Sequence, residues 1–221
     1  LEAIHTRGQL PFMIGGTGLY LEAVLLGYDL RPVPENPGRQ MELARLTDEV
    51  LTERLRRLKG PLHNTTDTSE HRRLVRAVEI AEGLAALPAA VPPPLNALVL
   101  GVRIPRAELR RRIRERLLAR LQAGMLDEVR GLLSQGVGAE RLRRLGLEYR
   151  FVTDYLLGEF PDYGEWVERL TLAICDFAKR QETWFRRMEK KGIPIRWIPA
   201  GAEAEASAII DTWRRESRKK H

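Results

Sequence analysis

Hydrophobic and polar residues follow two different periods along the chain, and these periods predict its elements. Two short apolar runs, Leu10 to Ile14 and Leu98 to Val102, have the pattern of strands buried on both faces of a parallel sheet. Gly15 and Gly16 end the first run, and a helical pattern begins at Thr17. This order of strand, glycine turn and helix predicts an α/β fold.

Most of the remaining chain has the period of about 3.6 residues that marks helices with one buried face. A helix predicted from Pro105 carries Leu109, Ile113, Leu117 and Leu121 on one stripe. The other predicted elements are the end of a helix at Leu1 to Gln9, helices at Thr17 to Gly27, Asn36 to Lys59, Asp67 to Glu82, Met125 to Gln135, Glu140 to Leu145, Arg150 to Leu157 and Gly164 to Lys191, a strand at Ile193 to Ile198 and a tail helix from Ala202. Their expected buried stripes are Leu19, Ala23 and Leu26 after Thr17, then Leu43, Leu46, Val50 and Leu58 after Asn36, then Trp166, Leu170, Ile174, Phe177, Trp184 and Met188 in the long helix.

Proline-rich stretches divide the chain into three predicted parts. Prolines gather between Leu30 and Pro37 and again between Pro88 and Pro94, and the segment between them has only helical patterns. We predict a core α/β part at 1–31, a helical insertion at 32–94, and a core strand followed by C-terminal helices at 95–221. The first residues resemble the last turns of a helix without a cap, so we expect the chain to begin in the middle of a fold.

Composition restricts the partners. The 221 residues carry a net charge of +7, which favours a polyanion without choosing between RNA, DNA and phosphorylated small molecules. The single cysteine, Cys175, cannot form an internal disulfide, and we interpret it as a small buried hydrophobe. No apolar run is long enough to cross a bilayer and no signal-peptide pattern is present, so we expect a cytoplasmic protein with no membrane partner. The four histidines, His5, His63, His71 and His221, lack metal-ligand spacing, and we expect no metal site built by the chain itself.

The first candidate site is the turn Gly15 to Tyr20. Glycines at a strand-to-helix junction allow the backbone to approach an anion, and the helix N-terminus offers free N–H donors. Thr17 adds a hydroxyl in the same place. Simple turn chemistry explains the same residues, and the pattern by itself favours that alternative.

The second candidate is a group of arginines on one predicted helix face, Arg72, Arg73 and Arg76. Guanidinium groups bind phosphate oxygens in pairs of hydrogen bonds, which suits an RNA backbone. A solvated face whose arginines pair with Glu70 and Glu79 is the alternative.

The third candidate lies in the long helix, where Lys179, Thr183 and Arg186 follow a face next to the buried stripe. These cations could lie near a diphosphate or an RNA backbone, or the face could simply meet water. The aromatic residues of this segment belong to the predicted core and are not favoured as platforms for bases.

In combination, three segments resemble motifs of the tRNA dimethylallyltransferases, in the order that the family has them. They are Pro11 to Tyr20, Arg72 to Glu79 and Ala178 to Phe185, and the segment Gly124 to Val129 is similar as well. The resemblance covers nearly the whole chain. It implies a core related to the P-loop kinases, with a parallel sheet that is partial here, an inserted helical domain that closes on the tRNA anticodon stem-loop, and C-terminal helices.

The resemblance also implies a reaction, the transfer of a dimethylallyl group from dimethylallyl diphosphate to N6 of the adenosine adjacent to the anticodon. That base is flipped out of its stack, and cations and backbone donors assist the departing diphosphate, with Mg²⁺ expected. The resemblance gives Thr17, Lys179 and Arg180 as catalytic candidates. The candidates for tRNA binding are Gly15, Gly16, Thr17, Arg39, Arg72, Arg73, Arg76, Arg143, Gly146, Gln181, Trp184 and Arg186.

The chain departs from the family pattern in two ways. It contains no Gly-x-x-x-x-Gly-Lys-Ser/Thr loop and no early aspartate to act as general base, so we expect it to be inactive alone. The usual Gly-Tyr-Arg/Lys-Glu is replaced by the stretch from Gly146 to Arg150, to which we assign no catalysis. An adenylate dimethylallyltransferase acting on a free nucleotide and a non-catalytic basic RNA-binding module remain as alternatives. We expect a monomer.

Overall fold

The computed structural model describes residues 1–60, 70–88 and 95–218. The chain forms two compact units. The core unit consists of Leu1–Glu22 and Asn96–His221, and the helical unit is Ala23–Leu95. The helical unit therefore lies between two stretches of the core unit in the sequence.

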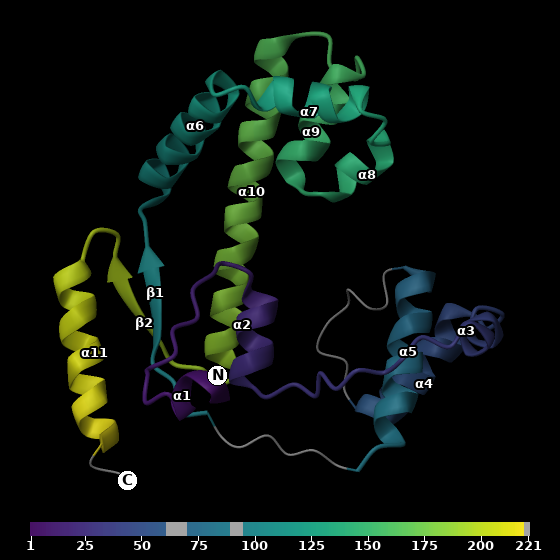
Figure 1. Ribbon diagram of the computed structural model, residues 1–221, viewed down its shortest axis with the longest axis vertical. Helices are drawn as coiled ribbons and strands as arrows, with labels where there is room; N and C mark the ends of the chain where they lie inside the picture. Colours follow the sequence, from purple (N-terminus) through teal and green to yellow (C-terminus); the bar gives the residue numbers. More distant parts are fainter. Residues whose placement is uncertain (61–69, 89–94, 219–221) are drawn as a thin grey trace. The chain divides into compact units, whose positions relative to one another are not determined.

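The core unit contains two strands, β1 (Val99–Arg103) and β2 (Ile195–Pro199), which pair in parallel with Val99 opposite Ile195. They lie side by side in Figure 1, followed by α11 (Glu203–Arg218). Gly101 lies opposite Trp197, and a Cβ there would lie 2.6 Å from the indole Cε3, so this strand position needs glycine. Two of the three predicted strands, Leu98 to Val102 and Ile193 to Ile198, are confirmed, with boundaries shifted by one or two residues.

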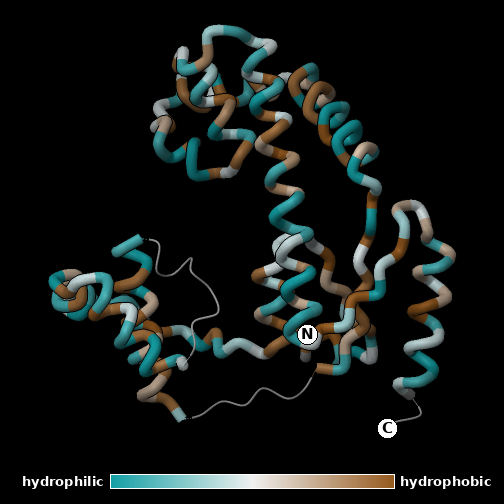
Figure 2. The backbone as a smooth tube through the Cα atoms, turned by 180° about the vertical axis from the view of Figure 1, so that it is seen from behind, coloured by the Kyte–Doolittle hydropathy of each residue, from teal (hydrophilic) through white to brown (hydrophobic). Residues whose placement is uncertain are grey.

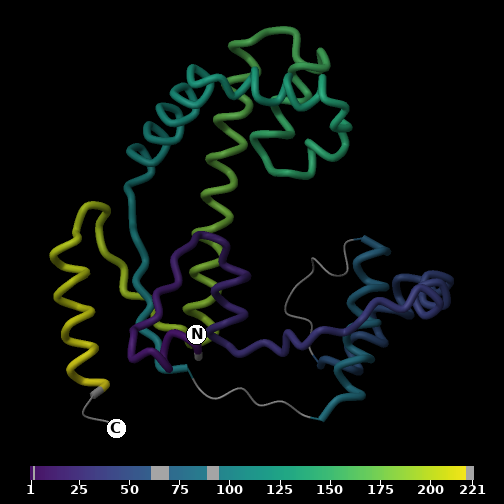
Figure 3. The backbone as a smooth tube through the Cα atoms, in the orientation of Figure 1, coloured from purple at the N-terminus to yellow at the C-terminus, as the bar shows by residue number. Residues whose placement is uncertain are grey.

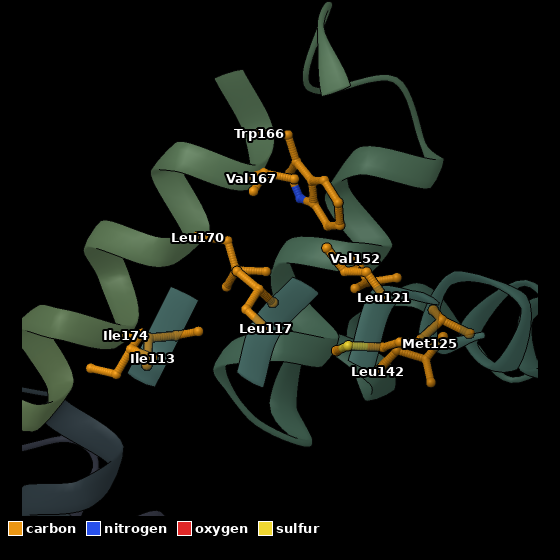
Figure 4. Packing of buried hydrophobic residues seen from close by; sticks show 11 residues of the cluster. Ile113, Leu117, Leu121, Met125, Leu142, Val152, Trp166, Val167, Leu170 and Ile174 are labelled. Carbon is orange, nitrogen blue, oxygen red and sulfur yellow. The ribbon is translucent and has the colours of Figure 1, made fainter. Parts of the chain in front are cut away.

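The hydrophobic core of this unit lies among five helices: α6 (Arg106–Gln122), α7 (Met125–Ser134), α8 (Ala139–Arg144), α9 (Leu147–Leu156) and α10 (Tyr163–Lys190). Its most deeply buried side chains include Leu117 of α6 and Trp166 and Leu170 of α10 (Figure 4). The Trp166 indole donates to the Phe151 carbonyl at 2.8 Å, so the largest core side chain leaves no buried donor unpaired. The side chain of Asp162 caps α10 by accepting a hydrogen bond from the Glu165 N–H at 2.8 Å.

The predicted stripes of α6 and α10 are mostly confirmed. Ile113, Leu117 and Leu121 are buried, and hydrophobic and hydrophilic positions alternate along α10 in Figure 2. Phe177, however, is 46% exposed, so its place in the predicted core was wrong. The main core cluster reaches Ile174 and Ala178 on α10 and does not extend to the Phe177 ring. Cys175 is half-buried beside this core.

The helical unit contains α3 (Pro37–Leu43), α4 (Asp48–Lys59) and α5 (His71–Ala85). The helix start predicted at Asn36 is confirmed, since Asn36 caps α3 and its side chain accepts from the Arg39 N–H at 3.0 Å. The single helix predicted from Asn36 to Lys59 was wrong, because the chain turns after Leu43 and α4 begins again after Thr47. This break rotates the buried face of α4, so its core residues are Leu51 and Leu55, whereas the predicted Val50 and Leu58 are 50% and 36% exposed. The predicted helix start at Asp67 and the prolines at 92–94 lie outside the described residues.

The N-terminal stretch contains α1 (Glu2–Thr6) and α2 (Gly18–Leu25). The strand predicted at Leu10 to Ile14 was wrong, since Phe12 and Ile14 are 65% and 94% exposed and, within the described ranges, β1 and β2 pair only with each other. An apolar run indicates a tendency to be buried, but a strand forms only where a partner accepts its backbone hydrogen bonds. Among the described helices, none has the length and apolarity needed to cross a bilayer.

The predicted stripe of α2 was also wrong in part. Leu19 and Leu26 are exposed, while Glu22 and Ala23 are buried. The inward face of α2 lies beside the C-terminal half of α10 (Figure 3). Glu22 on this face is bonded to Lys191, which follows α10.

Candidate functional site

The glycine turn that precedes α2 is held directly against α10. Gln181 of α10 donates from its side-chain amide to the Gly16 carbonyl at 2.8 Å. A Cβ on Gly16 would lie 2.7 Å from that amide nitrogen, and a Cβ on Gly18 would overlap the indole of Trp184. Gly18 therefore needs to be glycine for the backbone to approach α10 this closely, while a Cβ at Gly16 would displace the Gln181 amide.

An ion pair extends the contact to the next turn of α2. The Glu22 side chain is only 2% exposed and pairs with the Lys191 ammonium group, which directly follows α10. A buried carboxylate is costly unless it is paired, so this ion pair fixes which face of α2 meets α10. The Trp184 indole is covered on one face by the Arg187 guanidinium, 4.7 Å from the ring centre.

The structure thus brings Gly16, Thr17, Gln181 and Trp184 of the predicted site into one place. Thr17 itself is exposed, as is Gly15. Lys179 and Arg180 are exposed on the same turn of α10 that carries Gln181. Lys179 has no carboxylate partner in the described part of the chain, and the Arg180 guanidinium lies 5.8 Å from the centre of the Phe177 ring. Arg186 forms a surface ion pair with Glu182 at 2.5 Å.

In the helical unit, Arg39 is bound by carboxylates. Its Nε and Nη2 donate to the two oxygens of Glu82 at 2.9 and 3.0 Å, and Nη1 donates to Glu42 at 2.6 Å. The hydrogen bond to Glu82 raises the pKa of Arg39, and the same bond lowers the pKa of Glu82. Arg39 therefore holds α3 on α5, with its donors directed into the unit.

Arg76 has a similar place beside a buried carboxylate, Glu79. Its Nη1 donates to Glu79 at 2.5 Å and its Nη2 to the Val33 carbonyl at 2.7 Å. Glu79, 4% exposed, also accepts from the Asn36 N–H at 2.7 Å and from Gln40 at 2.9 Å. Burial raises the pKa of Glu79, but the hydrogen bonds from Arg76, Asn36 and Gln40 outweigh it, and the pKa is lowered overall.

The predicted arginine group is therefore divided between two roles. Arg72 and Arg73 are exposed, and Arg73 forms only a surface pair with Glu70 at 3.2 Å. Arg72 has no ion-pair partner within the described ranges. Of the three arginines, Arg72 and Arg73 can meet a polyanion without leaving a buried partner.

The predicted residue Arg143 is also held by carboxylates, through Asp154 at 2.7 Å and Glu140 at 2.9 Å, and these hydrogen bonds raise its pKa. It lines a cleft of about 490 Å³ together with Asp154, Glu159, Phe160, Pro161, Glu165 and Arg169. Gly146, whose φ of +142° favours glycine, precedes α9.

The stretch that departs from the family pattern connects three helices. Glu148 pairs with Arg120 of α6, and the Tyr149 hydroxyl donates to Glu128 of α7, which raises the pKa of Tyr149. These contacts connect α9 to α6 and α7.

Sequence reasoning missed three residues that organise these sites, Glu22 and Lys191 in the core unit and Glu82 in the helical unit, whereas Glu79 had been named as a possible partner of the arginines. A usable signal existed for Glu22 alone, since it is the one acidic residue between Thr17 and Gly27.

For a metal ion, the described part of the chain offers no group of three or more His, Cys, Asp or Glu side chains. A Mg²⁺ ion that arrives with a diphosphate needs only one or two protein ligands, so the expected Mg²⁺ stays a prediction.

A solved structure with a similar fold indicates the class of protein. The crystal structure of the full-length tRNA isopentenylpyrophosphate transferase from Bacillus halodurans matches with a TM-score of 0.62 at 25% identity, covering 100% of this chain and 72% of that one. The profile of the family described as IPP transferase matches residues 1–188, and the chain belongs to this family.

Curated relatives agree with this assignment. The tRNA dimethylallyltransferase 2 of Syntrophotalea carbinolica is 50% identical over 202 residues, which are 90% of this chain and 67% of the relative. The tRNA dimethylallyltransferase 1 of Geotalea uraniireducens is 50% identical over 209 residues, which are 94% of this chain and 69% of the relative.

The close approach at Gly18 leads to a stability prediction. We expect Gly18→Ala to lower the free energy of unfolding by about 1–3 kcal/mol, because the new methyl group overlaps the Trp184 ring. Gly131→Ala in α7 is the matched control, since nothing lies within 4 Å of a Cβ there, and we expect it to be neutral or slightly stabilising. Urea denaturation measures both, and equal effects would contradict the close contact.

His71 leads to a pH prediction for the helical unit. Its Nδ1 lies 2.6 Å from the Asp48 carboxylate and its Nε2 lies 3.1 Å from the Ala44 carbonyl, so only the doubly protonated ring donates to both acceptors. The hydrogen bond to Asp48 raises the pKa of His71 above its ordinary value of 6.5.

A raised pKa in the folded state means that the interaction stabilises the fold fully below about pH 6.5 and is lost as the pH rises through the folded pKa. We expect the difference in melting temperature between the wild type and Asp48→Asn to shrink from pH 5.5 to pH 8.5. NMR titration of the His71 ring gives the pKa directly. A pKa at or below the ordinary value would contradict the hydrogen-bonded arrangement.

Proposed function

We propose that the protein transfers a dimethylallyl group from dimethylallyl diphosphate to N6 of the adenosine adjacent to the anticodon of tRNA. The observation that carries this proposal is the hydrogen bond between Gly16 and Gln181, which joins two motifs 165 positions apart in the sequence. The curated relatives, named as tRNA dimethylallyltransferases, support the same activity.

The reaction requires a base outside its stack and a stabilised leaving group. The adenosine is extruded from the anticodon loop, N6 attacks the allylic carbon, the bond from that carbon to the diphosphate oxygen breaks, and N6 releases a proton. Negative charge builds on the diphosphate as the bond breaks. Lys179 and Arg180, both exposed on α10, supply positive charge for it, and the Thr17 hydroxyl meets the RNA beside the extruded base.

The helical unit supplies the grip on the anticodon stem-loop. Arg72 and Arg73 meet the phosphates, because their guanidinium groups are exposed, whereas Arg39 and Arg76 shape this surface from within. Arg143 has the same indirect role in the core unit. We further propose a monomer acting in the cytoplasm, where its tRNA substrate is found, and Mg²⁺ bound to the diphosphate.

A transfer assay with the full gene product containing this chain tests the proposal. Labelled dimethylallyl diphosphate is incubated with an anticodon stem-loop RNA, with the same RNA carrying guanosine in place of the target adenosine, and with AMP. We expect label only in the adenosine-bearing RNA, recovered after digestion as N6-dimethylallyladenosine. Label on AMP would identify an adenylate dimethylallyltransferase, and RNA binding without label would identify a binding module.

The division of the arginines leads to a separate binding prediction. We expect Arg72→Ala to weaken stem-loop affinity and to reduce the slope of log affinity against log salt by about one, because one phosphate contact is lost. Melting temperature should stay unchanged, since Arg72 has no partner among the described residues. Arg57→Ala, an exposed arginine on α4 without an ion pair in the described ranges, is the charge-matched control. Equal losses in both variants would mean that only net charge matters.

A further inference from the structure

The contact between Gln181 and Gly16 determines the direction of the next backbone donor. The Gly16 carbonyl points at the Gln181 amide, and none of the described peptide bonds is cis. In a planar trans peptide the N–H points opposite to the carbonyl of the same unit. The N–H of Thr17 therefore points away from α10.

The two neighbours of Thr17 are both fixed by α10. Gln181 holds Gly16 through the hydrogen bond, and Trp184 fills the space beside Gly18. Gln181 and Trp184 are three positions apart, so they lie on one face of the helix. Thr17 lies between these two fixed points with its own side chain exposed.

Both helix residues already make contacts within the protein in this arrangement. The Gln181 amide nitrogen is bonded to Gly16, the edge of the Trp184 indole meets Gly18, and its face is covered by Arg187. The Trp184 Nε1 is itself buried, without an acceptor among the described residues. One face and one edge of the ring are thus occupied within the protein, which favours a packing role over stacking on a base.

We propose that Gln181 and Trp184 are positioning residues, which fix the glycine turn so that the Thr17 N–H and hydroxyl face the tRNA. This role takes the place of the direct RNA contacts that the family resemblance implied for both side chains. This inference rests on the proposed function, in which Thr17 meets the RNA.

Gln181→Glu in the full gene product tests the proposal, since it keeps the side chain's size and removes the donor to Gly16. The Michaelis constant for tRNA should rise about three- to tenfold, the range expected for one hydrogen bond, because the turn loses its fixed orientation. The turnover number at saturating tRNA and the Michaelis constant for dimethylallyl diphosphate should stay unchanged. Gln122→Glu, at an exposed position at the end of α6, makes the same charge change and should leave all three constants as in the wild type.

A pH series distinguishes positioning from general damage. When the new carboxyl of Gln181→Glu is protonated it can donate to Gly16 again, so its tRNA affinity relative to the wild type should recover as the pH falls from 7.5 to about 4, close to the ordinary pKa of a glutamate. Adding Thr17→Ala should shrink the effect of Gln181→Glu, because both substitutions act on one turn. An affinity ratio that is independent of pH, or effects that simply multiply, would overturn the proposal.

Gly16→Ala provides an independent route if Gln181→Glu folds poorly, because its methyl group displaces the same amide. It should raise the Michaelis constant for tRNA and leave the turnover number unchanged, and normal constants would count against the proposal. Gly131→Ala is its control. Failure of the wild type to transfer the prenyl group would reject the proposed function itself, whereas an active wild type with a wild-type-like Gln181→Glu would reject only this inference.

Discussion

The core unit's candidate site depends on one constraint, the approach of a side-chain-free backbone to a long helix. Because Gly16 and Gly18 lack Cβ atoms, the turn comes close enough for Gln181 to bond to a main-chain carbonyl and for Trp184 to pack against the peptide. The Glu22–Lys191 ion pair then fixes the rotation of α2. Each contact alone is modest in energy, but together they define where Thr17 lies, since a short turn with both ends fixed has few conformations left.

In the helical unit, hydrogen-bonded ion pairs fix how the helices pack. Glu79 and Glu82 on α5 bind arginines from α3, α4 and α5 itself, and these bonds connect the three helices around a small apolar core. A unit of this size gains little from hydrophobic burial alone, so hydrogen-bonded ion pairs also specify its packing. These ion pairs fix the direction of the arginine side chains. Removing one partner would leave the other charge unpaired.

Periodicity predicted the core unit's helices well because its signal is local. The stripe Ile113, Leu117 and Leu121 specifies one face of α6, whatever that face meets. The strand at Leu10 to Ile14 failed because strand formation depends on a partner that periodicity does not reveal. The prediction of one continuous helix through Leu43 failed because the break depends on how α4 packs against α5. The motif at Gly15 to Tyr20 was found from its residue types, but its contact with Gln181 required the tertiary structure.

The net charge of +7 gives a misleading picture of how this protein would hold RNA. Arg39, Arg76 and Arg143, three of the arginines that the sequence indicated for binding, have their donors directed at carboxylates of the same unit. Their charge still contributes to a long-range field, which steers a polyanion toward the surface. Short-range recognition, however, needs donors that are free to bond, and among the candidate residues these are Arg72, Lys179, Arg180 and the backbone around Thr17. Affinity should therefore follow the geometry of these few groups more closely than the count of basic residues, and a substitution that reorients the turn at Thr17 can matter as much as one that removes a charge.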